Sequence, residues 1–184
     1  MKNGLEIYDN ILTSEECAEI ISLYESNENK RSGEVGRNIV DPTIKKSTDI
    51  GLSFISPSSK KYNKILRPAL NTAAKKFIST YDILNKISPW RLECSYNIQK
   101  YTDDEGYFSL HCEQEIITSY RILAWMIYLN DAECGTEFPY QDLIVKAKEG
   151  RCVLWSAGWT HAHKGVTPNR GKKYIATGWY EYIH

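Results

Sequence analysis

The stretch RILAWMIYL (121–129) decides the fold, because it is apolar at almost every position. A strand with one solvated face alternates apolar and polar residues, whereas a strand covered on both faces does not. The stretch is also far shorter than the roughly 20 apolar residues that a membrane-spanning helix needs. It therefore predicts a central strand in a sheet that is covered on both faces.

The segments around this stretch also predict strands. LECSYNI (92–98) alternates apolar and polar residues, which is typical of a half-buried strand. Further strands are predicted at 143–147, 151–155 and 173–183, with turn-forming sequences such as NDAECG and KEG between them. Short strands in this arrangement, next to a helical layer, favour a sandwich or a jelly roll.

The N-terminal half predicts helices instead. Thr13 and Glu16 have the spacing of a capping box, and the apolar residues that follow recur at helical spacing. A second helical region is predicted over about 58–81. Pro68 lies inside that region, which predicts either a kinked helix or two separate helices.

Length and composition narrow the class of protein. With 184 residues, we expect one domain over 1–184, with helical support over 1–89 and a β core over 90–184. Lysine plus arginine and aspartate plus glutamate both number 23, so no basic excess indicates a nucleic-acid partner. No apolar run indicates a membrane helix, and the N-terminus lacks the apolar region of a secretory signal. Five cysteines without a CxxC pair favour reduced thiols and a cytoplasmic location.

His111 and Glu113 form the first half of a candidate metal site. They stand two positions apart, so on a strand both side chains would point to the same face. One more histidine from a distant strand would complete a 2-His-1-carboxylate triad, the usual site of non-haem Fe(II) in oxygenases. His163 is the candidate third ligand, and His161 is its alternative. An H-x-E pair alone is a weak signal, because two polar residues on a surface strand give the same pattern.

The order and spacing of these motifs resemble the Fe(II)- and 2-oxoglutarate-dependent dioxygenases, in particular their prolyl 4-hydroxylase-like branch. That branch has a tyrosine, an H-x-D motif about ten residues later, and a distal H-x-G followed by G-x-[KR]-Y. Here Tyr101 precedes His111 by ten residues, and His163 precedes Lys173 by ten. The segments RILAWMIYLND, CGTEFPY and GRCVLW resemble the family's apolar strand, its G-G-T-x-F turn and the strand before its distal histidine. The resemblance covers nearly the whole chain and is densest over 96–180.

The resemblance implies a fold and a role for each candidate residue. The fold is a double-stranded β-helix jelly roll with the N-terminal helices packed on one sheet. The implied metal ligands are His111, Glu113 and His163, and Lys173 is implied as the only pocket cation and the partner of the far carboxylate of 2-oxoglutarate. The remaining implied cosubstrate and pocket residues are Tyr101, Tyr128, Thr177, Trp179 and His161. Ordinary core packing is the alternative for the tyrosines and for Trp179, and Lys172 is expected to face solvent.

Two residues depart from the family pattern. Glu113 stands where most of the branch has aspartate, which adds one methylene to the metal carboxylate. Cys134 replaces the first glycine of the G-G turn, a position where glycine could adopt a positive φ freely. Both positions can be checked in the structure.

The implied activity is hydroxylation of an unactivated C–H bond with Fe(II), 2-oxoglutarate and O2, with ascorbate as reductant. Peptidyl proline is the favoured substrate by resemblance, and free amino acids or other protein side chains remain open. Two other classes are considered: a cupin-like metalloenzyme that does not use 2-oxoglutarate, and a non-catalytic β-sandwich that binds a ligand. A complete triad together with Lys173 favours the dioxygenase.

Overall fold

The N-terminal helix begins where the sequence predicts. The computed structural model describes residues 3–36, 39–168 and 170–183. In helix α1 (Ser14–Glu25), the Thr13 side chain accepts a hydrogen bond from the Glu16 N–H, and the Glu16 carboxylate accepts one from the Thr13 N–H. The predicted capping box is confirmed, and it satisfies backbone donors that the first helical turn leaves without partners.

Helix α2 (Lys60–Thr80) continues through Pro68, so the alternative of two separate helices is wrong. Pro68 lies on the exposed side of α2, where water can bind the carbonyl that the proline ring leaves without an amide partner. A short 3-10 turn, η1 (Pro57–Ser59), leads into the helix. Within the described part of the chain, no helix is long and apolar enough to cross a membrane.

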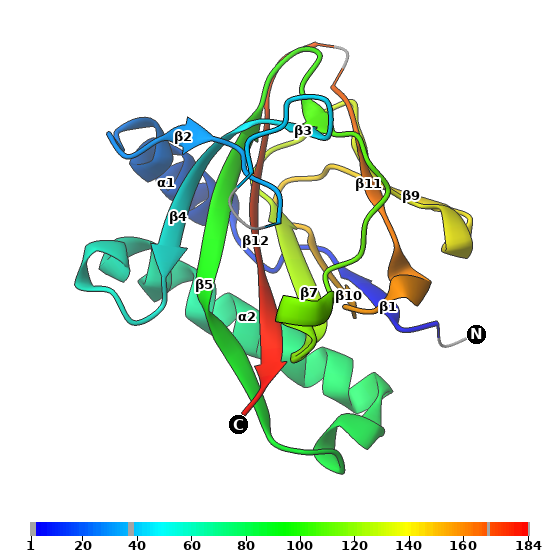
Figure 1. The fold of residues 1–184 in the computed structure, drawn as a ribbon. Coiled ribbons are helices and arrows are strands. Elements are labelled where there is room, and N and C mark those ends of the chain that lie inside the picture. Colours follow the sequence, from blue (N-terminus) through cyan, green and yellow to red (C-terminus); the bar gives the residue numbers. More distant parts are fainter. Residues whose placement is uncertain (1–2, 37–38, 169, 184) are drawn as a thin grey trace.

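Most strands belong to one large antiparallel sheet (Figure 1). Among the described residues it has seven strands, in the order β1-β10-β7-β12-β5-β4-β2. Their bounds are β1 Leu5–Tyr8, β2 Arg31–Ser32, β4 Thr48–Ser53, β5 Trp90–Tyr101, β7 Arg121–Tyr128, β10 Cys152–Ser156 and β12 Lys173–Tyr182. Strand β7, the apolar stretch that decides the fold, lies between β10 and β12, and its prediction as a central strand is confirmed.

The described residues also form two smaller sheets. Strands β11 (Lys164–Val166), β8 (Gly135–Phe138) and β9 (Leu143–Lys146) form one, and β3 (Lys45–Lys46) pairs with β6 (Gly106–Tyr107) in the other. Four further 3-10 turns connect the elements: η2 Asp82–Asn85, η3 Ile116–Thr118, η4 Pro139–Gln141 and η5 Trp159–His161.

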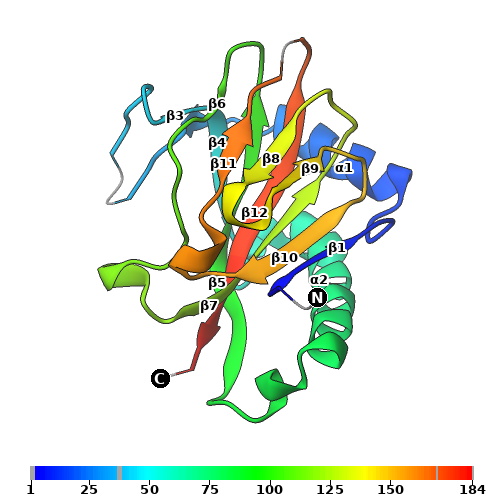
Figure 2. The same cartoon turned by 90° about the vertical axis from the view of Figure 1, so that its right-hand side faces the viewer.

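Two hydrophobic cores lie on opposite faces of the large sheet. The odd-numbered side chains of the β7 stretch, from Leu123 to Leu129, pack against α1 and α2. The even-numbered ones, from Ala124 to Tyr128, join residues of β8 and β9 in the second core. Figure 2 shows both helices behind the large sheet, with β8, β9 and β11 in front of it. The mainly β architecture, a double-stranded β-helix with helices on one sheet, is the predicted one.

The structure differs from the sequence prediction at β5 and β4. The polar face of β5 is only partly solvated: Ser95 is exposed, but Glu93 and Gln99 are buried, and Asn97 and Gln99 line a cavity. Strand β4, which pairs with β5 along its whole length, was not predicted. Its apolar residues do alternate, but the strand is only six residues long and follows a polar segment, so its periodicity is a weak signal.

The turn before β8 explains why Cys134 is tolerated. Cys134 does not have a positive φ, so the first position of the turn does not need glycine. Gly135 is different, because a Cβ atom there would lie 2.0 Å from the Val145 carbonyl oxygen. The close approach of β8 to β9 therefore requires only the second glycine of the family turn, and this chain retains it.

Candidate metal centre and cosubstrate pocket

Backbone hydrogen bonds bring the two candidate histidine ligands together. The N–H of His111 donates to the His163 carbonyl at 3.0 Å, and the N–H of His163 donates to the His111 carbonyl at 2.8 Å. The two residues thus form an isolated antiparallel bridge rather than part of a named strand. Glu113 lies in a bend after the bridge, where its N–H donates to the Ala157 carbonyl. Residues 111–113 therefore do not form the strand that the sequence predicts. The side chains of His111 and Glu113 nevertheless point toward each other.

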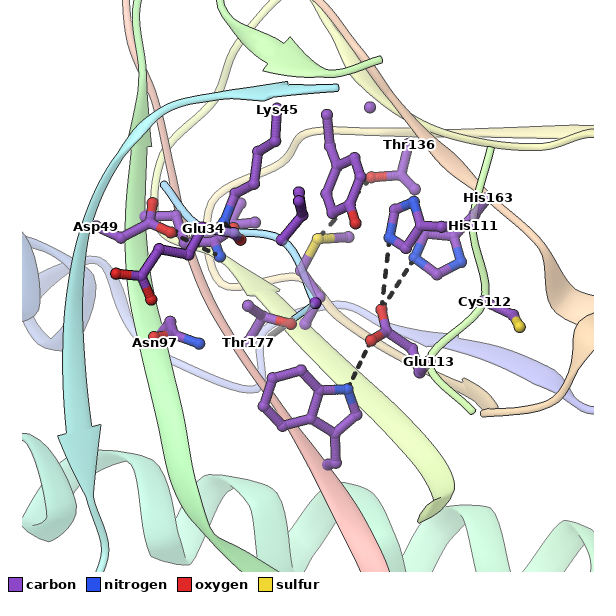
Figure 3. Close-up of a pocket in the computed structure, with 18 of the residues that line it drawn as sticks. Glu34, Lys45, Asp49, Asn97, His111, Cys112, Glu113, Thr136, His163 and Thr177 are labelled. Atoms are coloured by element: carbon purple, nitrogen blue, oxygen red, sulfur yellow. Dashed lines mark hydrogen bonds and ion pairs between the residues drawn. The ribbon is translucent and has the colours of Figure 1, made fainter. Parts of the chain in front are cut away.

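The side chains of His111, Glu113 and His163 meet at one point (Figure 3). Oε1 of Glu113 lies 3.2 Å from Nε2 of His163 and 3.7 Å from Nε2 of His111. All three candidate ligand atoms lie within 4.8 Å of one another. Cys112 points away from them in Figure 3, and its thiol donates to the Gln114 carbonyl, so it is not a ligand of this group.

The hydrogen bonds of the imidazoles fix which nitrogens face the centre. Nδ1 of His111 lies 3.0 Å from the Ser109 carbonyl oxygen, and Nδ1 of His163 lies 2.9 Å from the His161 carbonyl oxygen. Because a carbonyl only accepts, each Nδ1 carries the proton in the neutral ring, and each Nε2 presents a lone pair. These lone pairs face the Glu113 carboxylate without an intervening proton, an arrangement that a cation between the three groups would stabilise.

The protonation states also suit a metal. Burial, together with the neighbouring His163, lowers the pKa of His111 to about 4. Burial alone would raise the pKa of Glu113, but the positive charge that the two imidazoles carry when protonated and the indole N–H of Trp179 lower it to about 2. At neutral pH the centre therefore holds a neutral His111 and an ionised Glu113, the forms that bind a divalent metal. Two imidazoles and one carboxylate fit non-haem Fe(II).

Aromatic rings hold the imidazoles in place. The Tyr107 ring stacks on His111 with centroids 3.6 Å apart, and the Phe138 ring stacks on His163 at 5.2 Å. The edge of Trp155 packs against His163 at 4.9 Å. Sequence reasoning did not identify these supports, because they come from separate elements and no local motif contains them.

A cavity of about 390 Å³ extends from the triad to Lys173. Lys173 is 2% exposed and has no acidic partner among the residues that the structure describes. Its Nζ reaches only the carbonyls of Gly135 and Val166, both at 3.4 Å, and lies 4.7 Å from the centre of the Tyr101 ring. Burial lowers the pKa of Lys173. A buried ammonium without a counterion is costly, so this end of the cavity favours an anionic ligand.

Lys173 is not the only cation in the cavity, which corrects the expectation from the sequence. Lys45 also lines it and is 4% exposed. Its Nζ lies 2.6 Å from Oδ2 of Asp49, an equally buried carboxylate. The charge of Lys45 is therefore already compensated within the protein, which leaves Lys173 as the better partner for an added carboxylate.

The hydroxyl residues expected near the cosubstrate take different positions. Tyr101 and Thr177 line the cavity, and their hydroxyls donate to the Gln99 side chain at 2.8 Å and to a backbone carbonyl at 3.0 Å. Tyr128 does not line it. Its hydroxyl lies 2.8 Å from Oγ1 of Thr136, and Thr136 stands between Tyr128 and the cavity. The sequence prediction overlooked Thr136, although it belongs to the CGTEFPY turn that carried the resemblance.

His161 and Trp179 were both expected at the pocket wall, but only Trp179 lines the cavity. The His161 ring lies instead against the N-terminal segment, with Nε2 2.7 Å from the Asn3 carbonyl oxygen. This residue is in turn η5 rather than on a strand, which removes the geometric reason for placing it beside His163. The indole N–H of Trp179 donates to Oε2 of Glu113 at 2.8 Å, a contact that the sequence did not indicate.

Comparison with known proteins adds to this geometry. The family model for the 2OG-Fe(II) oxygenase superfamily matches residues 96–181. No curated protein matches the chain significantly.

Solved structures resemble the chain in fold. A prolyl hydroxylase from Trichoplax adhaerens, in complex with a hypoxia inducible factor peptide fragment, gives a TM-score of 0.74 at 19% identity, covering 98% of this chain and 84% of that one. A Pseudomonas putida prolyl-4-hydroxylase gives 0.70 at 14% identity, covering 100% and 95%. The viral collagen prolyl hydroxylase of Paramecium bursaria Chlorella virus-1 gives 0.68 at 16% identity, covering 98% and 97%. At these identities the likeness shows the fold alone.

The matched sequence segment contains His111, Glu113 and His163, and the fold brings their ligand atoms together at one end of a cavity. Residues 96–181 of the chain therefore belong to the 2OG-Fe(II) oxygenase superfamily.

Proposed function

We propose that the protein is a prolyl 4-hydroxylase-like oxygenase that hydroxylates a C–H bond of a peptidyl or amino-acid substrate. The observation that carries the proposal is the unpaired, buried Lys173 in the same cavity as the triad. A cavity with a metal triad and a desolvated cation suits a metal-chelating dicarboxylate such as 2-oxoglutarate. A cupin-like enzyme without an anionic cosubstrate would leave the charge of Lys173 without a partner, and a non-catalytic sandwich would have no use for the triad in the same cavity.

The residues that line the cavity have separate roles in the proposed reaction. Fe(II) bound to the triad would supply the chemistry, in which O2 and 2-oxoglutarate yield succinate, CO2 and a hydroxylated product. Lys173 binds the far carboxylate of 2-oxoglutarate, and Thr136, rather than Tyr128, offers a hydroxyl beside it. Met126 and Ile175 provide apolar walls that exclude water from this part of the cavity. The protein thereby positions the cosubstrate and protects the reaction, as is usual for cofactor-dependent enzymes.

The partly exposed lining residues of the cavity support a substrate with amide groups. Asn97 is one of them, and Arg31 and Glu34 contribute charges of opposite sign 3.8 Å apart. A carboxamide can both donate to and accept from a peptide group. This mixed, nearly neutral lining suits a peptide or an amino acid better than a strongly charged polymer.

The extra methylene of Glu113 leads to a prediction. Glu113→Asp is expected to retain measurable 2-oxoglutarate turnover, because aspartate is the commoner ligand of the family. Glu113→Gln is expected to lose it, because a neutral amide binds Fe(II) much more weakly than a carboxylate. Succinate formation by the two variants at fixed Fe(II) is the measurement. Equal activity of Glu113→Gln and the unaltered protein would show that Glu113 is not a ligand.

The proposed reaction is tested by measuring succinate release with Fe(II), ascorbate and 2-oxoglutarate over a panel of prolyl peptides, other peptides and free amino acids. We expect a prolyl peptide to stimulate succinate release and to gain one oxygen atom by mass spectrometry. Stimulation by a free amino acid instead would keep the oxygenase and replace the substrate. If no member of the panel stimulates release above the rate without substrate, the proposed substrate class is wrong.

The unpaired state of all five cysteines supports a reducing compartment, consistent with the cytoplasmic location expected from the sequence. Burial raises the pKa of the Cys17 thiol to about 12, so this cysteine is unreactive as a thiolate near neutral pH. Microscopy of the fluorescently tagged protein in its own cells tests the location.

A further inference from the structure

The two oxygens of the Glu113 carboxylate have different partners. Oε1 faces the two Nε2 atoms, at 3.2 Å from His163 and 3.7 Å from His111. Oε2 points the other way and accepts the indole N–H of Trp179 at 2.8 Å. Figure 3 shows the contacts of the Glu113 carboxylate with His111 and His163 as dashed lines. One oxygen is therefore directed to the metal position, and the other is held by a hydrogen-bond donor.

We propose that Trp179 is a positioning residue that holds Oε2 of Glu113 and so leaves Oε1 alone to bind the metal. The inference rests on the proposed function, because it takes the triad as the metal site. The inference concerns Glu113, the residue that replaces the aspartate of the usual H-x-D motif in this chain.

A glutamate needs such a restraint more than an aspartate does. Its additional methylene adds one rotatable bond and lengthens the reach of the carboxylate. A free carboxylate could rotate to bind through both oxygens, which would occupy one of the three positions that a facial triad leaves open. A hydrogen bond from Trp179 to Oε2 opposes that rotation. Partners of this kind orient metal ligands and tune the affinity of the site.

Trp179 is itself held by two charged residues. The Arg121 guanidinium lies 3.5 Å from the centre of the indole ring, a cation–π contact. Nε of Arg121 in turn donates to Oε2 of Glu93 at 3.0 Å, and Glu93 is 7% exposed. A buried carboxylate thus fixes the guanidinium, and the guanidinium fixes the plane of the ring whose N–H reaches Glu113.

The strand pairing is also irregular at this point. In the β12–β5 ladder, Gly178 pairs with Tyr96 and Tyr180 with Leu92, so residues 93–95 of β5 lie opposite Trp179 alone. Bulges of this kind redirect side chains and are common next to active sites. The irregularity includes Glu93, the residue that begins the chain of contacts to Glu113. The backbone and the side chains therefore support the same orientation of Trp179.

The test is a titration with Co(II) alone, read by its visible absorption, for a double-mutant cycle of Trp179→Phe and Glu113→Asp. In the unaltered background, Trp179→Phe should weaken Co(II) affinity by about 10- to 100-fold, the usual effect of losing such a partner. It should also change the intensity of the Co(II) bands, because the coordination number changes. In the Glu113→Asp background the shorter carboxylate no longer reaches the indole, so the same substitution should have a much smaller effect.

Trp90→Phe is the matched control, because it removes an indole hydrogen bond of similar length, to the Leu84 carbonyl at 2.9 Å, outside the cavity. It should leave Co(II) affinity and the Co(II) spectrum unchanged.

If Trp179→Phe does not fold, the double variant Glu93→Gln/Arg121→Met provides a second test. It keeps the indole of Trp179 but removes the contacts that hold the ring, and it should weaken Co(II) binding only when residue 113 is glutamate. Equal effects in both backgrounds, or none in either, overturn the inference. Absence of Co(II) binding by the unaltered protein would instead contradict the metal site itself.

Discussion

Lys173→Ala is expected to raise the apparent KM for 2-oxoglutarate by about a hundredfold or more, with Fe(II) binding nearly unchanged. Lys173 is 2% exposed and, within the described part of the chain, its ammonium has no carboxylate partner. Removing one member of a desolvated charge pair typically costs about 3–5 kcal/mol, and about 1.4 kcal/mol corresponds to a factor of ten in affinity. Titration of 2-oxoglutarate at fixed Fe(II) measures the effect.

Two variants control this prediction. Lys172→Ala should have little effect, because Lys172 precedes β12 and is exposed, whereas Lys173 is buried. Lys173→Arg should give an intermediate KM, because the charge is retained while the longer planar head must find room. A damaging Lys172→Ala combined with a silent Lys173→Ala would show that the assignment of the cosubstrate cation is wrong.

His163→Ala is expected to abolish Fe(II) binding, because it removes one of only three protein ligands. The fold should persist, since the His163–His111 bridge is made by backbone groups that alanine retains. Anaerobic Fe(II) binding and thermal unfolding together separate the two effects.

His161→Ala is the matched control, since His161 lies two residues away with its ring held at the Asn3 carbonyl. It should retain most of the iron affinity. Loss of iron in His161→Ala but not in His163→Ala would reverse the assignment of the distal ligand.

Periodicity and motif spacing predicted much of this protein. The apolar run of β7 indicated a strand covered on both faces, and the Thr13–Glu16 pair indicated the start of α1; both signals are local and depend on short stretches of backbone. The spacing between Tyr101, His111, His163 and Lys173 carried the family resemblance. These four residues could be predicted because their spacing along the chain matches the spacing of the family's motifs.

Other features depend on contacts between distant elements, which spacing does not encode. The Lys45–Asp49 pair occupies the cavity because β3 and β4 fold over it, and the short segment offered no clear period. Thr136 covers the hydroxyl of Tyr128 because β8 packs across β7. The polar face of β5 predicted contact with solvent, because polar residues occur both on solvent-exposed surfaces and on the walls of polar cavities. His161 was misplaced because a 3-10 turn, rather than a strand, precedes His163.

The central claim is that this cavity binds a metal and 2-oxoglutarate together. The most direct measurement is an anaerobic titration of 2-oxoglutarate into the Fe(II)-loaded protein, followed in the visible, where chelation of the metal by the keto acid gives a charge-transfer band. We predict a band that saturates with one 2-oxoglutarate bound per chain, that needs much more 2-oxoglutarate in Lys173→Ala, and that is absent in His163→Ala. An Fe(II)-loaded protein that shows no band at any concentration of 2-oxoglutarate would contradict the account.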